Sequence, residues 1–402
     1  MASAGTGVQP QTVAPAAIET RPQAPPARLY YLDYLRAGVV ALVMLHHTAI
    51  TYGGSGSWYY ADASTSKYVQ ALLTWLTGYD QAWFMAFLFF LSGYLSLPSY
   101  TRKGAGPYLV DRLRRFGIPL VVYFFGISAV VTWLTVIAGP GPHPSLLAYW
   151  QSQYLTFRIM DTGPLWFVWA LLLMDVALVL WAGRRSGTEL AGRRETATFP
   201  SRRRLVVFAI GIGLAAFVVR LVIPVGATVL WGLQLGYFPS YVAMFVLGLW
   251  AWHGRWLDAI PDSAFRFART CAIVGALTFP VLLVLGVALP GGAAAFAGGL
   301  HVQALAYALW EPWVLVGVSI CLLHWGRRRL NAPSPRWQGW ASASYMAYIL
   351  QPLALVPIAI LFTGVGLPAL VKFVVVGALT IVCAYGLARL VRLVPPVRTA
   401  IG

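Results

Sequence analysis

The chain has 402 residues, of which 59% are hydrophobic and only 10% are charged. This composition excludes an ordinary soluble enzyme, in which roughly a quarter of the residues carry a charge. Lys and Arg together number 29 against 12 for Asp and Glu, so the formal net charge is +17. Such an excess indicates a nucleic acid or an anionic membrane surface as the partner. Because the cations lie between long apolar runs, we predict membrane lipid as the partner and exclude nucleic acid.

The N-terminal segment differs from the rest of the chain. Residues 1–28 are rich in Ala, Pro, Gln and Thr and hold no apolar core of signal-peptide length, which predicts a disordered cytoplasmic tail. Residues 29–402 are predicted to form one membrane domain. Its three cysteines lie far apart within apolar runs, so the sequence predicts neither a disulfide framework nor a metal site.

Ten apolar runs in this domain are long enough for a helix to cross a hydrocarbon layer of about 30 Å. They cover residues 32–51, 69–97, 116–138, 164–182, 205–223, 237–253, 270–289, 302–325, 340–362 and 369–392. The sequence thus predicts an all-α integral membrane protein, a bundle of about ten transmembrane helices. The second run would make a helix about 43 Å long, which exceeds the hydrocarbon thickness. A break is therefore predicted at residues 78–81.

The cations test this count, because cytoplasmic loops carry an excess of Lys and Arg. With both termini inside, 25 of the 29 cations fall on the inner side, and only Lys67, Arg158, Arg220 and Lys372 fall on the other. A miscounted helix would scramble the alternation, so the split supports ten spans with cytoplasmic termini. The Ala- and Arg-rich composition is compatible with the plasma (inner) membrane of a bacterium. The external loops, such as residues 52–67 and 139–161, are too short for a folded catalytic domain, so any chemistry must take place in or between the helices.

The first span carries Arg36 near its cytoplasmic end and His46 and His47 deep inside. Ionisable groups at such depth usually face a bundle interior or a watery cavity. Helix geometry brings Arg36 and His47 to within about 20° of one face, with His47 about 16 Å further along the axis. One cavity lined by this face would connect the cation to an imidazole near mid-depth. The alternative is a histidine hydrogen-bonded between helices and an arginine that only anchors the helix. Asp33, three residues before Arg36, is its predicted orienting partner.

The arginine, ten residues and histidine of this span form a motif, and several later segments extend it. They are WFMAFLFFLSGYLS, RKGAGPYLVDRLRRFGIPLVVY, GPLWFVWALLL, LQLGYFPSYVAMFVLGLWA and SYMAYILQPLALV. Over most of residues 29–402 the chain resembles the acyltransferase 3 family of integral-membrane acyltransferases, including its glucan succinyltransferase-like branch. The resemblance implies transfer of an acyl group from cytoplasmic acyl-CoA to a hydroxyl, commonly of a carbohydrate, at or beyond the outer face. It also implies that Arg36 and His47 are required for activity.

A coenzyme A donor, as acetyl-CoA or succinyl-CoA, would need cations at the cytoplasmic mouth for its phosphates. Arg112, Arg114 and Arg115 are predicted to supply them, because guanidinium groups match phosphate oxygens bidentately. The alternative is that this basic loop only sets the topology. Ser92 and Gly93 in the second run would let either a thin ligand or another helix approach closely.

Four further side chains are predicted to bind the acceptor. Arg220, Glu311 and Asp80 are ionisable groups in or beside apolar runs, and the alternative is that they form buried structural pairs. Arg220 was the expected partner of Asp161 or Asp80. Trp166 would stack on a sugar ring, or would belong to the aromatic belt at the membrane interface.

Together these residues predict a membrane O-acyltransferase in which His47 is the general base and Arg36 positions the donor. A covalent acyl-histidine intermediate is the main mechanistic variant. Two other classes of protein remain open from the sequence: a transporter or flippase of a glycan or lipid, which should show repeat-related halves with broken helices, and a receptor or structural membrane protein. The acyl group, the acceptor and whether the chain forms a homo-oligomer are also left open.

Overall fold

The computed structural model describes residues 29–62, 65–160, 162–185 and 198–393, so the predicted cytoplasmic tail lies outside the described residues. Within these ranges the chain is helical, and the extended backbone is limited to one isolated bridge between Val229 and Leu233. The long helices are α1 (Tyr30–Thr51), α2 (Lys67–Gln81), α3 (Phe84–Lys103), α8 (Trp166–Ala182), α10 (Arg202–Arg220), α11 (Phe238–His253), α12 (Asp262–Ala288), α13 (Val302–Arg329), α14 (Pro335–Leu361) and α15 (Ala369–Val391). The prediction of an all-α membrane bundle is confirmed.

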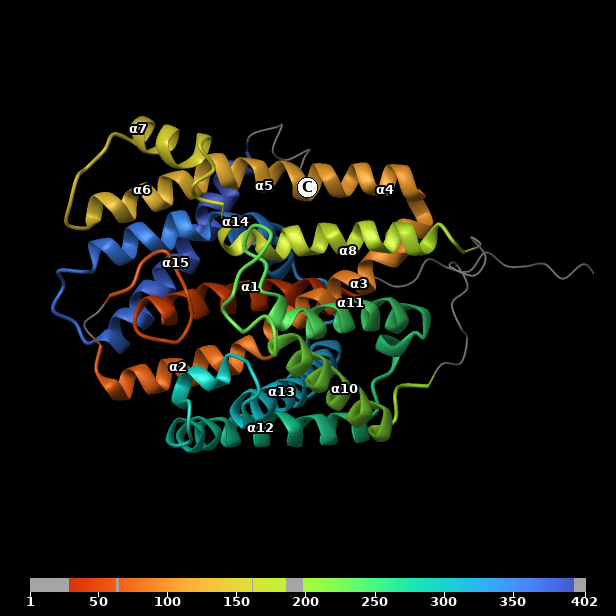
Figure 1. Cartoon of the computed structure of the whole chain (residues 1–402). Coiled ribbons are helices and arrows are strands. Elements are labelled where there is room, and N and C mark those ends of the chain that lie inside the picture. Colours follow the sequence, from red (N-terminus) through yellow and green to blue (C-terminus); the bar gives the residue numbers. More distant parts are fainter. Residues whose placement is uncertain (1–28, 63–64, 161, 186–197, 394–402) are drawn as a thin grey trace, which may run out of the picture.

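One further span is built from several pieces. It runs without interruption through α4 (Ala105–Arg112), α5 (Ile118–Val122) and α6 (Ala129–Ala138), which two π-helical segments join. The span begins eleven residues before the predicted residue 116, so the basic segment before it is helical, and the expectation of a basic loop is wrong. A short helix, α7 (Leu146–Trp150), then packs beside α6 (Figure 1).

Nine helical segments of the described chain are long and apolar enough to cross a membrane. The one predicted span outside these nine segments is the fifth, residues 205–223, which corresponds to α10. This helix has 19 residues and includes four arginines, Arg202, Arg203, Arg204 and Arg220. Each of the ten predicted spans therefore overlaps a helix. The predicted break in the second run is also present, because α2 ends at Gln81 and α3 begins at Phe84.

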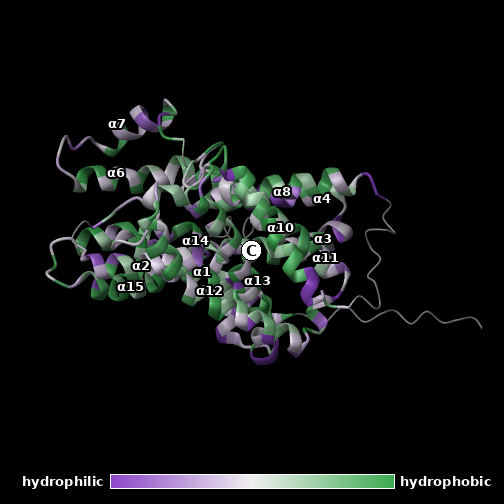
Figure 2. Ribbon diagram, turned by 60° about the horizontal axis from the view of Figure 1, so that its bottom comes forward, coloured by the Kyte–Doolittle hydropathy of each residue, from purple (hydrophilic) through white to green (hydrophobic). Residues whose placement is uncertain are grey.

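The helices run in broadly the same direction in Figure 1, with α1 in the middle of the view. The N-terminal helix α1 packs against α2, α14 and α15, while α12 packs on α13, and α13 in turn packs on α10. Apolar side chains remain on the outside of the bundle, as on α12, where Leu277 and Val284 are 69% and 71% exposed. Figure 2 shows hydrophobic residues over much of the helical surface. Exposed apolar surface of this extent is what a lipid environment accommodates.

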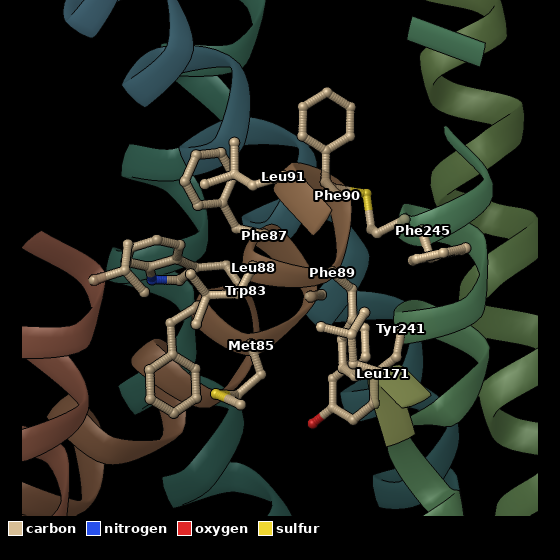
Figure 3. Close-up of a cluster of buried hydrophobic side chains, with 14 of the residues drawn as sticks. Trp83, Met85, Phe87, Leu88, Phe89, Phe90, Leu91, Leu171, Tyr241 and Phe245 are labelled. Atoms are coloured by element: carbon tan, nitrogen blue, oxygen red, sulfur yellow. The ribbon is translucent and has the colours of Figure 1, made fainter. Parts of the chain in front are cut away.

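The core of the bundle lies around α3. Its residues from Trp83 to Leu91 are buried and meet Tyr241 and Phe245 of α11 (Figure 3). The two backbones come very close, because a Cβ built on Gly93 would lie 2.1 Å from the carbonyl oxygen of Phe245. On the facing helix, a Cβ on Gly248 would lie 2.3 Å from the carbonyl oxygen of Phe90. The glycines thus allow a close helix crossing of the kind that membrane proteins favour.

Candidate functional site

A cavity of about 840 Å³ opens at the end of the bundle where α1 ends at Thr51, which the cation distribution assigns to the outer side. His46 and His47 of α1 line it, together with residues 55–59 of the following loop. The break between α2 and α3, residues around Gly163 to Trp166, the segment around residues 225–241 and the outer half of α12 complete the wall. The cavity thus joins parts of the chain that are far apart in sequence around the two histidines.

His47 is held from two sides. Its Nδ1 lies 3.3 Å from Oε1 of Gln351, a fully buried residue of α14, and its ring stacks on the indole of Trp58 with centroids 3.9 Å apart. Because Oε1 can only accept, Nδ1 carries the proton in this contact, and Nε2 keeps its lone pair. An imidazole in this tautomer can take a proton from a substrate hydroxyl.

The loop that carries Trp58 is fastened to the bundle. Nζ of Lys372 on α15 lies 2.8 Å from a carboxylate oxygen of Asp62, and both side chains are almost fully buried. The backbone N–H of Asp62 donates to the carbonyl of Thr51 at the end of α1. These contacts hold the loop against the outer end of the bundle, and so fix the indole that covers His47.

His46 points to a different neighbour. It is buried, its Nδ1 lies 3.8 Å from a carboxylate oxygen of Asp80 on α2, and its ring meets Phe84 at 4.8 Å. Asp80 is itself buried and is not one of the residues that line the cavity, so this arrangement does not form its predicted contact with an acceptor. The two histidines contact each other edge to face, with centroids 5.7 Å apart.

Arg36 lies at the inner end of α1. Its guanidinium forms the expected pair with Asp33 at 3.1 Å and lies close enough to Arg115 for the two charges to repel each other. The lining of the outer cavity begins on α1 at Val43, seven residues or about 10 Å beyond Arg36. The outer cavity therefore does not extend from His47 to Arg36, whereas the sequence predicted that one cavity joins them. Between them α1 carries buried apolar residues such as Val40.

The three predicted phosphate-binding arginines have different surroundings. Nε of Arg112 lies 3.3 Å from the buried carboxylate of Asp175 on α8, which also accepts hydrogen bonds from Tyr108 and Ser96. Its charge is thus already matched, which argues against the predicted role of Arg112 in binding phosphate. Arg115 is half-buried and also approaches the ring of Tyr345, whereas Arg114 is exposed. These two remain candidates for binding an anion, together with Arg36, whose pair with Asp33 leaves its Nε without a hydrogen bond.

Ser92 and Gly93, which were predicted to contact the donor, both lie on α3. Gly93 faces the backbone of α11 at the close crossing described above, which leaves little room for a ligand beside it, and its role at the donor site stays a prediction. The adjacent Ser92 is half-buried on the same helix and does not line the cavity. The alternative of close helix contact is the one that the structure supports for Gly93.

Arg220 and Glu311 form a buried ion pair. Their side chains meet at 2.6 Å, and Nε of Arg220 donates to the carbonyl of Gly236. The rings of Tyr237 and Tyr307 lie over the guanidinium, and both of these tyrosines line the cavity. The ion pair is not part of the cavity lining, which fits the alternative of a buried structural pair, and direct binding of the acceptor by Arg220 and Glu311 stays a prediction. The expected partner Asp80 pairs elsewhere, and Asp161 lies outside the described residues.

Trp166 is the predicted acceptor residue that does line the cavity. Its ring stacks on Tyr241 with centroids 5.4 Å apart, and it is half-buried. A sugar ring entering the cavity would meet an aromatic surface here, which suits stacking.

The sequence reasoning missed several residues of this region. Trp58 and Gln351 hold His47, Tyr348 lines the cavity and donates to the carbonyl of Pro164, and Asp175 anchors the inner end. Gln351 and Asp175 each carry a signal, since a lone amide or carboxylate inside an apolar helix is costly unless it has a partner. Trp58 carries none, because nothing in an external loop indicates which residue folds back on the helix.

Comparison with known families identifies the chain. Residues 29–389 match the family model of the acyltransferase domain of the acyltransferase 3 family, which is nearly the whole chain. Neither a search of curated proteins nor a search of solved structures gives a match. Because this match covers nearly the whole chain, and the chain folds as a helical membrane bundle, the protein belongs to the acyltransferase 3 family of membrane acyltransferases.

Proposed function

We propose that this acyltransferase moves an acyl group from cytoplasmic acyl-CoA to a hydroxyl of a carbohydrate acceptor, with His47 as the general base. The observation that supports this most is the arrangement of His47 itself, which has Nδ1 bound to Gln351, a face stacked on Trp58 and a position on the wall of an 840 Å³ cavity. A cavity of this size is in the range of small-molecule sites, and its aromatic and hydroxyl-bearing lining suits a sugar.

In the proposed reaction Nε2 of His47 takes the proton of the acceptor hydroxyl as the oxygen attacks the thioester carbonyl. The carbon–oxygen bond forms, the carbon–sulfur bond breaks, and coenzyme A leaves as a thiolate that receives the proton from the imidazolium. General-base assistance of this kind contributes about 10²- to 10⁴-fold in rate. In the acyl-histidine variant Nε2 attacks the carbonyl first, and the acceptor oxygen then takes the acyl group from the imidazole.

The donor would bind with its phosphates at the inner end of the bundle. Arg36 and Arg115 come together there from α1 and from the span that contains α4, and their mutual repulsion would be relieved by an anion between them. Nε of Arg36 is buried and has no hydrogen-bond partner in the described structure, so it is free to bind a phosphate oxygen. The pantetheine arm would then have to follow α1 outward toward His47. Because side chains such as Val40 fill this path, they would have to move when the donor binds.

The test compares purified variants supplied with radiolabelled acyl-CoA. His47→Gln should lower acyl transfer by about 10²- to 10⁴-fold while donor affinity is retained, since the base is lost but not the donor site. Arg36→Gln should weaken donor binding, whereas Arg114→Gln, which removes the same charge from an exposed position at the same end, should have little effect. Full transfer by His47→Gln together with loss of transfer in His46→Ala would show that the wrong histidine was chosen.

The acceptor can be identified in cells. Mass spectrometry of surface glycans and lipids from cells with and without the gene should show one mass difference that names the acyl group and its acceptor together. The same experiment tests the proposed plasma-membrane location in a bacterium, because the modified molecule should be exposed outside it. A protein that neither binds nor consumes acyl-CoA while glycan or lipid distribution still changes would favour the transporter or flippase alternative.

A further inference from the structure

The outer cavity is electrically neutral at its surface. Of the described residues that line it, none is Asp, Glu, Lys or Arg, although the chain holds 29 cationic and 12 acidic residues. Its polar lining comes from hydroxyl, amide, indole and imidazole groups, including Ser57, Thr74, Gln81 and Gln234. These groups can hydrogen-bond a neutral solute, but they cannot balance a full charge.

The charged groups just behind the lining are already matched. Arg220 is held by Glu311 at 2.6 Å and is only 1% exposed. On the other side Asp80 faces His46 at 3.8 Å. Neither pair leaves a cation free to turn into the cavity. The residues beside the cavity therefore do not supply the charge that its surface lacks.

One wall of the cavity is wholly apolar. It is formed by Phe279, Leu283 and Val287 of α12 and by Phe296 and Ala297 of the segment that follows. This wall offers no hydrogen bonds from its side chains and raises the cost of bringing a charged group into the cavity. Two cations that lie near each other, Arg36 and Arg115, are instead at the inner end of the bundle.

We infer that this cavity accepts only uncharged groups on both sides of the reaction, so that the acyl group is acetyl or another short neutral acyl group, not succinyl, and the acceptor is an uncharged sugar. This inference rests on the proposed function. The acyl group must reach His47 for transfer, so the carboxylate of a succinyl group, three bonds beyond the thioester carbonyl, would enter the same neutral space. An acetyl methyl group needs no partner there. The reaction consumes acetyl-CoA and a sugar hydroxyl and yields the acetyl ester and free coenzyme A.

Donor binding tests the inference without knowledge of the acceptor. Coenzyme A, acetyl-CoA, butyryl-CoA and succinyl-CoA share the same nucleotide and arm, so differences in affinity report on the acyl pocket alone. Butyryl-CoA matches succinyl-CoA in chain length but lacks the carboxylate, which separates charge from size. We expect succinyl-CoA to bind about 100-fold more weakly than butyryl-CoA, as for a charge buried without a partner. Equal or tighter binding of succinyl-CoA would overturn the inference, whereas failure of all four to bind would overturn the proposed function and the inference with it.

A designed cation should reverse the preference. Ser57 lies in the exposed part of the loop beside Trp58 and lines the cavity, so a long side chain there can reach the acyl site. Ser57→Arg should raise the affinity for succinyl-CoA relative to butyryl-CoA by about 10-fold, while Ser57→Gln, which adds a shorter neutral side chain, should not. If both variants change this affinity ratio equally, the lack of a cation in the cavity is not what excludes the succinyl carboxylate.

For the acceptor, methyl glucoside should be acetylated at least about 10-fold faster than methyl glucuronide, and the reverse order would contradict the inference.

Discussion

Replacing Gly93 with alanine is expected to weaken the contact between α3 and α11 without touching the chemistry. The added Cβ would lie 2.1 Å from the carbonyl oxygen of Phe245, whereas ordinary contacts are about 3.5 Å, so the two helices must separate by roughly 1 Å. The obstacle is backbone and cannot rotate away. Overpacking of this kind costs about 1–3 kcal/mol, and the loss adds to whatever neighbouring contacts of the buried cluster are disturbed.

The measurement is the free energy of unfolding in mixed micelles, from a titration with a denaturing detergent. Gly386→Ala on α15 is the matched control, because a Cβ there meets nothing within 4 Å and the residue is exposed. That variant should be neutral or up to about 1 kcal/mol more stable, as alanine favours helix. Gly248→Ala should resemble Gly93→Ala, since its Cβ would meet the carbonyl oxygen of Phe90 at the same crossing.

The double variant sharpens the test. Once Gly93→Ala has pushed the helices apart, part of the space for a second methyl group at Gly248 already exists, so the two costs should sum to less than the separate losses. If the Gly93→Ala variant has the same free energy of unfolding as the wild type but binds acyl-CoA more weakly, this reasoning is refuted. That result would support the sequence-based assignment of Gly93 to the donor site.

Three further variants test the site. Gln351→Leu should lower the rate of acyl transfer by about 10- to 100-fold with donor affinity unchanged, because His47 loses the acceptor that fixes its tautomer, and Gln351→Glu should restore most of the rate in a transfer assay. Glu311→Gln should lower the free energy of unfolding by about 3–5 kcal/mol, since Arg220 is left buried without a counter-ion, while methionine at both positions should recover most of the loss in the same titration. Trp166→Leu should raise the KM for a neutral sugar acceptor by about 3- to 10-fold with little change in kcat, as expected for one lost stacking contact.

The number and order of the helices could be predicted because the membrane imposes a simple length rule and because the cations alternate between the two sides. The sequence also indicated the break near Gln81, where the run was too long for one span. It did not indicate that the third span begins at Ala105, since its first turns carry Lys- and Arg-rich flanks typical of a loop. Those cations are tolerated on a helix because Lys103 pairs with Asp111 and Arg112 pairs with Asp175.

The site was harder to predict than the fold. Helix geometry could separate His47 from His46, because the angle between two side chains around a helix depends only on their residue numbers and the helical repeat. The partners Gln351 and Trp58 lie 304 and 11 residues away from His47, and no local pattern relates them to it. The same limit explains why Arg220 was given the wrong carboxylate, because the packing of α10 on α13 decides which of several acidic residues it meets.

Pairing is what separates structural from chemical ionisable groups in this bundle. A charge inside a membrane protein must be balanced, and Arg220, Lys372 and Arg112 each have a carboxylate within 3.3 Å, so their presence is explained without a ligand. His47 has an amide partner and no carboxylate partner, and it lines the cavity. Arg36 is paired with Asp33 at 3.1 Å but also lies near a second cation, Arg115. The fold thus places an imidazole without a carboxylate at the outer end and two neighbouring cations at the inner end. An acyl-CoA that brings its phosphates to one end and a neutral acyl group to the other would complement both.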